Sequence, residues 1–266
     1  MVDSQDSSDS ADVVLVTAGA AGIGRCIAEK FLGGGCRVHV CDISRESIDE
    51  FLEANPSASA SLADVSIPSQ VDLLFTELIE LYGQLDVLVN NAGVAGPTAA
   101  VEDIEVEQWD QTIAVDLNGP FYVTRQAVPL LKQAGGGSIV NIASTAALFG
   151  FPLRSAYAAA KWALIGLTKT WAMELGPHNI RVNALCPGSV NGERIERVIS
   201  NDARERGVSA DSIRTIYQRQ SSMRLFVEAE DIANTAFFLG SDLGRAISGQ
   251  SVAVDGHTEG LSNWLD

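Results

Sequence analysis

The N-terminal part of the chain places a short apolar run, a glycine-rich turn and a helical pattern in direct succession. Val13–Thr17 is rich in β-branched residues and too short for a helix, so it predicts a buried strand. The turn Thr17-Ala-Gly-Ala-Ala-Gly-Ile-Gly24 follows, and helical spacing continues to Leu32. Glycines let a backbone approach a pyrophosphate, and a helix N-terminus stabilises its negative charge. The unit indicates a dinucleotide-binding turn, formed by Gly19, Gly22, Ile23 and Gly24.

Short apolar runs and helical patterns alternate along the rest of the chain. Further strands are expected at residues 37–41, 59–63, 85–89, 138–142, 180–185 and 250–254, and helices after Ser44 and at 68–82, 109–132 and 156–175. Gly119-Pro120 must distort the third of these helices. Strands that are apolar throughout belong to parallel sheets covered on both faces. We therefore expect an α/β fold: a single-domain, Rossmann-like doubly wound parallel sheet of about seven strands, spanning 13–266.

The charge balance excludes several classes of partner. The 266 residues contain 18 basic and 34 acidic side chains, a formal net charge of −16, which argues against nucleic acid and anionic membrane surfaces. No apolar run reaches the roughly 18 residues of a membrane span, and residues 1–12 resemble a disordered acidic tail rather than a signal peptide. We expect a cytoplasmic protein. The four cysteines and three histidines lack the spacing of metal ligands, so no metal is expected.

Asp42 follows the second expected strand, 18 residues after Gly24. A carboxylate at this position accepts hydrogen bonds from both ribose hydroxyls of NAD and repels the 2′-phosphate of NADP. Neither Ala21 nor Ile43 supplies a base that would neutralise such a phosphate, although Arg25 is near. NAD is therefore the expected cofactor. The alternative is an ordinary aspartate at the end of a strand.

Further motifs follow in order. Asn90-Asn91-Ala92-Gly93 ends the fourth strand, Ser144 follows the fifth, and Tyr157-Ala-Ala-Ala-Lys161 and Pro187-Gly188 come later. With the turn Thr17–Gly24, which resembles the pattern TGxxxGIG, these motifs make the chain similar to the short-chain dehydrogenase/reductase family from Val13 to about Gly256. YxxxK alone is common by chance, but the ordered set is specific.

The resemblance implies an oxidoreductase that interconverts a secondary alcohol and a ketone. Tyr157 and Lys161 lie on one face of a helix, where the ammonium favours tyrosinate. Tyr157 would exchange the proton with the substrate, Lys161 would also hold the nicotinamide ribose, and Ser144 would hydrogen-bond the reacting oxygen. The further cofactor contacts implied are Ile43, Asp64, Val65, Asn91, Ala92, Gly93, Pro187, Gly188 and Val190, besides Tyr157 and Lys161.

Two positions depart from the family pattern. The asparagine that usually helps to hold a proton-relay water is replaced by Asp116, which accepts hydrogen bonds but lacks the amide donor. We expect a working relay and count Asp116 among the catalytic residues. The threonine that commonly contacts the carboxamide of the cofactor falls at Gly192. The backbone of Val190 still offers groups to the carboxamide, and the role of the threonine either passes to Ser189 or Asn191 or is absent.

Residues 190–225 correspond to the variable substrate lid of the family and hold seven arginines against five acids. This points to a small hydroxylated anion, such as a sugar acid or hydroxy acid, or to a neutral polyol, with Arg154 and Arg194 as candidate carboxylate partners. Alternatively, the arginines pair with acids of the lid itself, namely Glu193, Glu196, Glu205 and Asp211.

Two other functions compete with this one. A carbonyl reductase acting on 3-oxoacyl groups of an acyl carrier is the alternative enzyme, although that reading prefers NADPH. A non-catalytic nucleotide-binding regulator would be expected to have lost Ser144, Tyr157 or Lys161, and all three are present.

Association is also expected. The helices at 109–132 and 156–175 resemble those that pair in family tetramers, so a homotetramer or homodimer is expected. Trp162, Leu164 and Trp171 would serve such an interface or pack against the sheet. The C-terminal residues 258–266 would fold over the active site of a neighbour.

Overall fold

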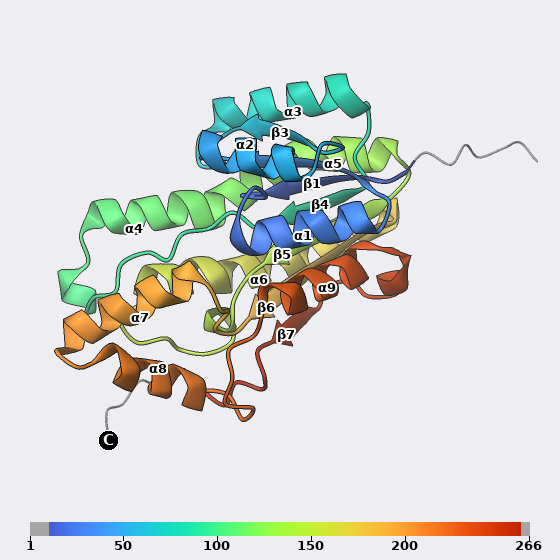
Figure 1. Cartoon of the computed structure of the whole chain (residues 1–266). Coiled ribbons are helices and arrows are strands. Elements are labelled where there is room, and N and C mark those ends of the chain that lie inside the picture. The colour runs from blue at the N-terminus through green and yellow to red at the C-terminus, as the bar shows by residue number, and fades with distance from the viewer. Residues whose placement is uncertain (1–10, 262–266) are drawn as a thin grey trace, which may run out of the picture.

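A computed structural model describes residues 11–261 of the chain. Seven strands form one parallel sheet in the order β3-β2-β1-β4-β5-β6-β7 (Figure 1). They are β1 (Val13–Thr17), β2 (Arg37–Asp42), β3 (Ser59–Leu62), β4 (Val87–Asn90), β5 (Gly137–Ile142), β6 (Ile180–Pro187) and β7 (Ser251–Val254). The predicted parallel, Rossmann-like fold is confirmed, and each strand lies within two residues of its expected bounds.

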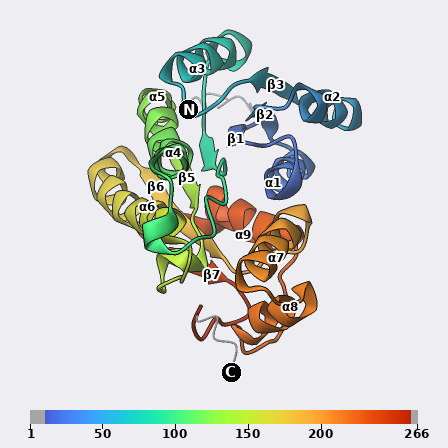
Figure 2. The same ribbon diagram turned by 90° about the vertical axis from the view of Figure 1, so that its left-hand side faces the viewer.

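Helices cover both faces of the sheet. They are α1 (Gly22–Gly33), α2 (Arg45–Ala54), α3 (Pro68–Tyr82), α4 (Val106–Ile113), α5 (Gly119–Gln133), α6 (Ser155–Leu175), α7 (Glu193–Arg206), α8 (Ala210–Arg219) and α9 (Ala229–Gly240). The apolar sides of α1, α2 and α9 pack on one face, and those of α3, α5 and α6 pack on the other (Figure 2). Alternate residues of each strand enter the two cores, because successive side chains point to opposite faces.

The order of strands reverses between β1 and β4, and this reversal locates the site. To one side of β1 lie β2 and β3, and to the other side lie β4 to β7. Crossover helices leave β1 and β4 on opposite faces, so a crevice opens at their carboxyl ends. The glycine turn after β1 and the Asn90–Gly93 motif after β4 both lie at this position.

One predicted helix is wrong in its bounds. The segment expected as a helix over 109–132 begins at Val106 as α4, passes through a π-helical turn, η2 (Ala114–Asn118), and continues as α5. Gly119 and Pro120 are the first residues of α5, where proline is tolerated because its missing N–H would have no helical partner. The distortion therefore precedes them, in the turn that carries Asp116.

The apolar residues of α3 and α6 divide into buried and exposed side chains. On α3, Val71, Leu74, Phe75 and Leu78 are buried as predicted, but Ile79 is 47% exposed. On α6, Leu164 and Trp171 are buried, so they do not form an outer surface, whereas Trp162 is 51% exposed. None of the helices within residues 11–261 is both long and apolar enough to cross a membrane.

The lid is formed by α7 and α8, which share a small apolar cluster of their own. Two isolated bridges hold its base, one between Val190 and Val227 and one between Ser221 and Thr258. Thr258 and Glu259 thus contact the base of the lid of their own chain, and residues 262–266 lie outside the described residues. Of the predicted acidic tail, only Ala11 and Asp12 are described, and their carbonyls accept hydrogen bonds from Arg37.

Candidate active site

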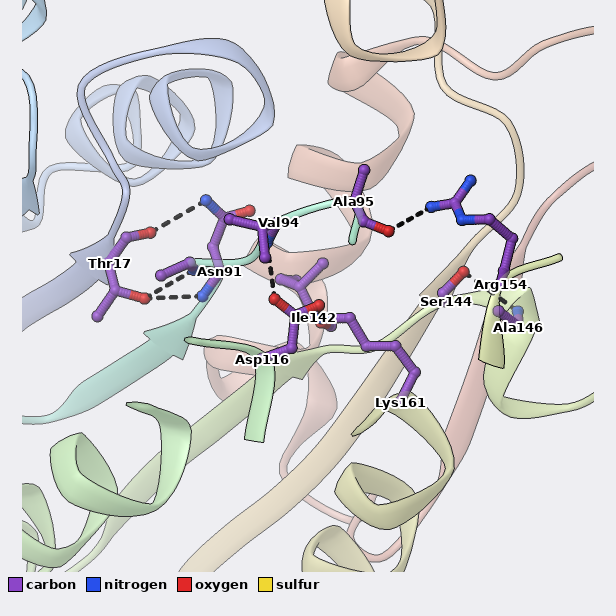
Figure 3. Close-up of polar contacts among 11 residues, drawn as sticks. Thr17, Asn91, Val94, Ala95, Asp116, Ile142, Ser144, Ala146, Arg154 and Lys161 are labelled. Atoms are coloured by element: carbon purple, nitrogen blue, oxygen red, sulfur yellow. Dashed lines mark hydrogen bonds and ion pairs between the residues drawn. The ribbon is translucent and has the colours of Figure 1, made fainter. Parts of the chain in front are cut away.

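The carboxyl ends of β1 and β4 are joined by a set of hydrogen bonds (Figure 3). Thr17 Oγ1 accepts from the backbone N–H groups of Asn91 and Ala92, each at 2.9 Å. Asn91 Nδ2 donates to the carbonyls of Thr17 at 3.0 Å and Ala18 at 3.1 Å. Buried polar groups on both sides of the crevice are thereby satisfied without a ligand. Asn91 therefore connects the ends of β1 and β4 through hydrogen bonds.

The glycine turn has little room for side chains. A Cβ at Gly24 would lie 2.0 Å from the Ala18 carbonyl oxygen and 2.5 Å from Asn91 Nδ2, so only glycine fits there. Ala18 itself has φ 47°, in the left-handed region that favours glycine. The first glycine of the pattern TGxxxGIG falls at this position, and this chain has alanine there with Gly19 one residue later. The turn thus keeps the backbone path of the motif at some cost in strain.

The N-terminus of α1 has the features of an anion site. Its N-cap residue is Ala21, whose side chain caps none of the first N–H groups. Those groups need acceptors, and the helix dipole favours a negative charge beside them. Gly22 has φ 53° and open space around it, and it is exposed together with Ala21. A pyrophosphate therefore fits the residues at the turn.

Asp42 lies at the end of β2, next to this turn. Its Oδ2 accepts from Ala20 N–H at 3.3 Å, and its Oδ1 accepts from Ser44 N–H at 3.1 Å. Ser44 caps α2 through Ser47, as predicted. Arg25, in the first turn of α1, is paired with Glu29 at 2.7 Å, whereas the exposed Arg45 follows Asp42 by three residues. The carboxylate of Asp42 is therefore held beside the turn by two backbone N–H groups.

Asp64 and Val65 follow β3 on the same edge of the sheet. Asp64 Oδ1 accepts from the N–H and the hydroxyl of Ser66, at 2.9 and 2.6 Å. Val65 is buried, and a Cβ at Gly119 would lie 2.8 Å from its Cγ2. Ile43, by contrast, is 73% exposed at the end of β2. The exposed side chain of Ile43 leaves apolar surface beside Asp42, against which an adenine ring fits.

Asp116 and Lys161 form a buried ion pair at the centre of the site (Figure 3). Asp116 Oδ2 lies 3.6 Å from Lys161 Nζ, and their side chains are 0% and 4% exposed. Asp116 Oδ1 accepts from Val94 N–H at 2.7 Å, while Oδ2 has no hydrogen-bond partner among the described residues. Lys161 Nζ also donates to the Ile142 carbonyl at 3.1 Å. The π-helical turn, a form often found at functional positions, presents Asp116 to the lysine.

Three cations surround the ring of Tyr157. The guanidinium carbon of Arg154 lies 5.1 Å from the ring centroid, Lys161 Nζ lies 5.6 Å away, and the guanidinium carbon of Arg194 lies 5.9 Å away. Arg154 and Lys161 come from the same stretch of chain as Tyr157, whereas Arg194 comes from the lid. Of the predicted substrate residues, both arginines are therefore brought to Tyr157.

Ser144 begins the short helix η3 (Thr145–Ala147) directly after β5, and its Oγ accepts from Ala146 N–H at 3.1 Å. The hydroxyl hydrogen is left to donate to a ligand. Behind it, burial raises the pKa of the Cys186 thiol to about 11, so this cysteine stays protonated near neutral pH. Cys186 is consequently not a competing nucleophile.

The segment after Pro187-Gly188 pairs with Val227 in a way that leaves Val190 available. Asn191 N–H donates to the Val227 carbonyl at 2.9 Å, and Val227 N–H donates to the Ser189 carbonyl at 2.9 Å. In a parallel bridge of this kind, the N–H and carbonyl of the central residue point to the other side. Val190 therefore presents both backbone groups that a carboxamide requires, consistent with the loss of a threonine at Gly192.

The lid arginines divide into two groups. Arg214 pairs with Glu196, as the alternative of pairing within the lid predicts, and Arg206 pairs with the buried Asp202, an acid that the alternative did not name. Arg194 has no such partner among the described residues and lies over Tyr157 instead. Sequence position alone did not distinguish these arginines.

Two contacts were not foreseen. Arg154 Nη2 donates to the Ala95 carbonyl at 2.6 Å (Figure 3), which ties the start of α6 to the loop after β4. Asn90 Nδ2 donates to Asn141 Oδ1 at 2.8 Å, and Asn141 Nδ2 to Thr168 Oγ1 at 2.9 Å. In the sequence, Asn90 and Asn141 are polar residues at or near the ends of two apolar strands. That pattern could have indicated their contact.

Comparison with known proteins identifies the family. Residues 18–258 match the family model described as enoyl-(acyl carrier protein) reductase. The chain belongs to the short-chain dehydrogenase/reductase family. It is 36% identical to the D-β-hydroxybutyrate dehydrogenase of Rhizobium meliloti, over 91% of this chain and 96% of that protein. It is 34% identical to the 3-oxoacyl-[acyl-carrier-protein] reductase of Thermotoga maritima, over 92% and 96%.

The solved structure of an NAD⁺-bound xylitol dehydrogenase superposes with a TM-score of 0.89 at 27% identity, covering 92% of this chain and 98% of that one. These matches identify an oxidoreductase acting on alcohols or ketones. The relatives act on different substrates, so the substrate depends on residues specific to this chain.

Proposed function

We propose that this member of the family is an NAD-dependent dehydrogenase that interconverts a secondary alcohol and a ketone on a small hydroxylated substrate, such as a hydroxy acid, a sugar acid or a polyol. The observation that carries the proposal is the buried Lys161 beside Tyr157 at the point where the strand order reverses. A tyrosine, a buried ammonium and a serine hydroxyl form a set that suits proton exchange with an alcohol.

Each residue has a separate task in the proposal. Tyr157 accepts the proton of the substrate hydroxyl during oxidation and returns it during reduction. Lys161 keeps a positive charge near Tyr157 and favours the tyrosinate form. Ser144 donates its free hydroxyl hydrogen to the reacting oxygen. Asp116 holds Lys161 in place and compensates its charge within the buried site.

The residues at the crevice fit NAD. The uncapped first turn of α1 would hold the pyrophosphate, Asp42 the ribose hydroxyls, and Val190 the carboxamide. When bound there, NAD supplies the hydride-accepting carbon. The preference for NAD over NADP rests on Asp42 and on the pairing of Arg25 with Glu29.

The test is an activity screen with a matched variant. Purified protein is supplied with NAD or NADP and with panels of polyols, hydroxy acids and sugar acids, and the formation of reduced cofactor is followed at 340 nm. We expect turnover with NAD of at least one secondary alcohol, and none with Tyr157→Phe. Activity in Tyr157→Phe equal to that of the wild type would contradict the assigned chemistry.

A reductase for 3-oxoacyl groups on an acyl carrier is the second candidate. The relative from Thermotoga maritima and the description of the matched family model favour it. It should bind NADPH more tightly than NADH, which Asp42 opposes. Titration of both reduced cofactors, followed by their fluorescence, separates the two candidates before any substrate is known.

Assembly and organisation are also proposed. Residues 13–266 form one functional domain with residues 190–225 as its lid. The exposed Trp162 on α6, together with Trp109 on α4 and Phe121 on α5, would form a contact between subunits of a homotetramer or homodimer. Light scattering of the wild type and of Trp162→Glu tests this assembly.

A further inference from the structure

The substrate side of the site is positively charged in a strongly acidic chain. The formal net charge is −16, yet two guanidinium groups and one ammonium lie within 6 Å of the Tyr157 ring centroid. Asp116 compensates the ammonium of Lys161. The charges of Arg154 and Arg194 are left without an acidic partner among the described residues. A local field of this sign concentrates anions at the site.

Arg154 is the more informative of the two arginines because it is buried. Only 4% of its surface is exposed, and it lies between the rings of Phe151 and Tyr157, at 5.2 and 5.1 Å. Its guanidinium donates one hydrogen bond, from Nη2 to the Ala95 carbonyl. Its Nε is buried and has no partner among the described residues. A planar cation with five donors is therefore held in place with most of its hydrogen-bonding capacity unused.

Asp202, a buried acid of the lid, does not pair with Arg154. Its carboxylate pairs with Arg206 instead. Burial raises the pKa of Tyr217 to about 12. The negative charge of Asp202 adds to this increase, and the positive charge of Arg154 opposes it. The pairing of Asp202 within the lid thus leaves Arg154 uncompensated.

Burial of a charged group is unfavourable unless the charge is paired and hydrogen-bonded. Lys161 meets this requirement through Asp116, and Arg154 does not. A carboxylate would supply both the missing charge and the acceptors, since guanidinium and carboxylate groups match in a planar, two-bond geometry. An alcohol would supply neither charge nor a second acceptor in that plane.

Arg194 is placed to approach the same anion from the lid. It is exposed in the first turn of α7, where the helix dipole disfavours a cation. Its position over Tyr157 is therefore not explained by helix stability. A carboxylate between Arg154 and Arg194 would be bound from the α6 side and from the lid side at once.

We propose that Arg154 is the residue that binds the carboxylate of the substrate, with Arg194 as a secondary contact from the lid, and that the substrate is a hydroxy acid with its carboxylate close to the reacting carbon. The closeness follows because the Arg154 guanidinium lies against the same ring that carries the reactive phenol. A 2- or 3-hydroxy acid spans that gap, while a carboxylate at the far end of a long chain does not. This inference rests on the proposed dehydrogenase function.

The experiment compares acids with their neutral counterparts in five proteins. The wild type, Arg154→Met, Arg154→Lys, Arg194→Met and the control Arg197→Met are assayed with lactate, 3-hydroxybutyrate, 4-hydroxyvalerate and the methyl ester of each. Arg197 is exposed on the same helix as Arg194 and serves no proposed role. A second measurement titrates butyrate or butanamide by calorimetry into each protein with NADH bound. Butyrate has the carboxylate but no reacting hydroxyl.

We expect the wild type to prefer a 2- or 3-hydroxy acid over its ester by roughly 100-fold in kcat/KM, and Arg154→Met to remove that preference by lowering kcat/KM for the acid far more than for the ester. Arg154→Lys should retain part of the preference, Arg194→Met should lose about tenfold, and Arg197→Met should lose none. Butyrate should bind the wild type and not Arg154→Met, and butanamide should bind neither.

Equal turnover of acids and esters by the wild type overturns the proposal, as does an equal loss of both in Arg154→Met, which would indicate a structural role. Turnover only of 4-hydroxyvalerate overturns the predicted closeness. If no alcohol is oxidised by the wild type, the proposed function fails. Calorimetry still decides the role of Arg154 in that case, because wild-type binding of butyrate that is lost in Arg154→Met supports it and absent binding contradicts it.

Discussion

The cofactor side and the substrate side of the crevice differ in how their polar groups are satisfied. Around β1, β2 and β4, Thr17, Asn91 and Asp42 already hydrogen-bond to backbone groups of the protein. Around the start of α6 and the lid, Arg154 and Arg194 lie against an aromatic ring without an acid. The first region is built before any ligand arrives. The second has a charge that the protein does not balance.

Lys161 lies at the boundary between the two regions, and its partners can be compared with those of Arg154. Its ammonium is as buried as the Arg154 guanidinium, but it has Asp116 and the Ile142 carbonyl as partners. The cation proposed to serve every catalytic cycle is paired within the protein. The cation proposed to select the substrate has no acidic partner among the described residues.

The largest expected effect separates chemistry from cofactor binding. Tyr157→Phe removes the proton-exchanging hydroxyl and should lower kcat by about 1,000-fold. Most of the proposed cofactor contacts lie elsewhere, at the turn after β1, Asp42 and Val190, so the dissociation constant for NADH, measured by fluorescence titration, should change by less than about threefold. A large loss of NADH affinity in this variant would mean that the two regions are not separable.

The next effect tests the cofactor side alone. Asp42→Ala removes the acceptor for the ribose hydroxyls and should lower kcat/KM for NAD by about 100-fold, while the value for NADP rises. Ser44→Ala is the matched control, because it removes the cap of α2 and leaves Asp42 in place. That control should lose about 1 kcal/mol of stability and keep the cofactor preference. A ratio of NAD to NADP turnover that Asp42→Ala leaves unchanged contradicts the assignment.

A smaller effect is expected at the boundary. Asp116→Asn leaves an acceptor for Val94 N–H but no charge to balance Lys161. We expect kcat to fall about tenfold and the pH–rate profile of alcohol oxidation to change, since the buried ammonium of Lys161 is left without its carboxylate. The measurement is the pH–rate profile of both proteins. An unchanged kcat and profile would leave no special role for the carboxylate.

The last prediction concerns the stability of the cofactor side, where the buried His39 lies on β2, and expects little effect on turnover. Burial lowers the pKa of His39 to about 4 from 6.5. Its two ring nitrogens lie 2.6 and 2.8 Å from the hydroxyls of Ser59 and Ser61. Above pH 6.5 both the folded and unfolded chains hold it neutral, so it has no pH effect there.

As the pH falls from 6.5 to 4, only the unfolded chain takes up the proton, and the free energy of unfolding should drop by about 3 kcal/mol. Urea unfolding at several pH values measures this drop. His39→Gln serves as the comparison, because the carboxylates of the chain contribute equally in both proteins. Parallel pH dependences in the two proteins would show that His39 contributes nothing.

Local pattern was sufficient for most elements of the sheet. Val13–Thr17 and Pro68–Tyr82 have the predicted bounds, because the first is an apolar run buried at every position and the second has a buried face that recurs with helical spacing. The π-helical turn at Ala114–Asn118 was not predictable, since its path depends on the contact between Asp116 and Val94 from another part of the chain. Likewise, the sequence of α6 does not show that Trp162 and Met173 are exposed while Leu164 and Trp171 are buried.

The sequence by itself determined the family and the order of its motifs, from the turn at Thr17–Gly24 to Tyr157, Lys161 and Pro187-Gly188. Those motifs depend on spacing along the chain, which is readable directly. Only the tertiary structure decided which cations are paired. Asp116 reaches Lys161, while Arg154 and Arg194 lie over the ring of Tyr157 without an acidic partner among the described residues. The reason is physical: an ion pair depends on distances of a few ångströms between residues far apart in sequence, and only the packing of α6, the lid and the loop after β4 sets those distances.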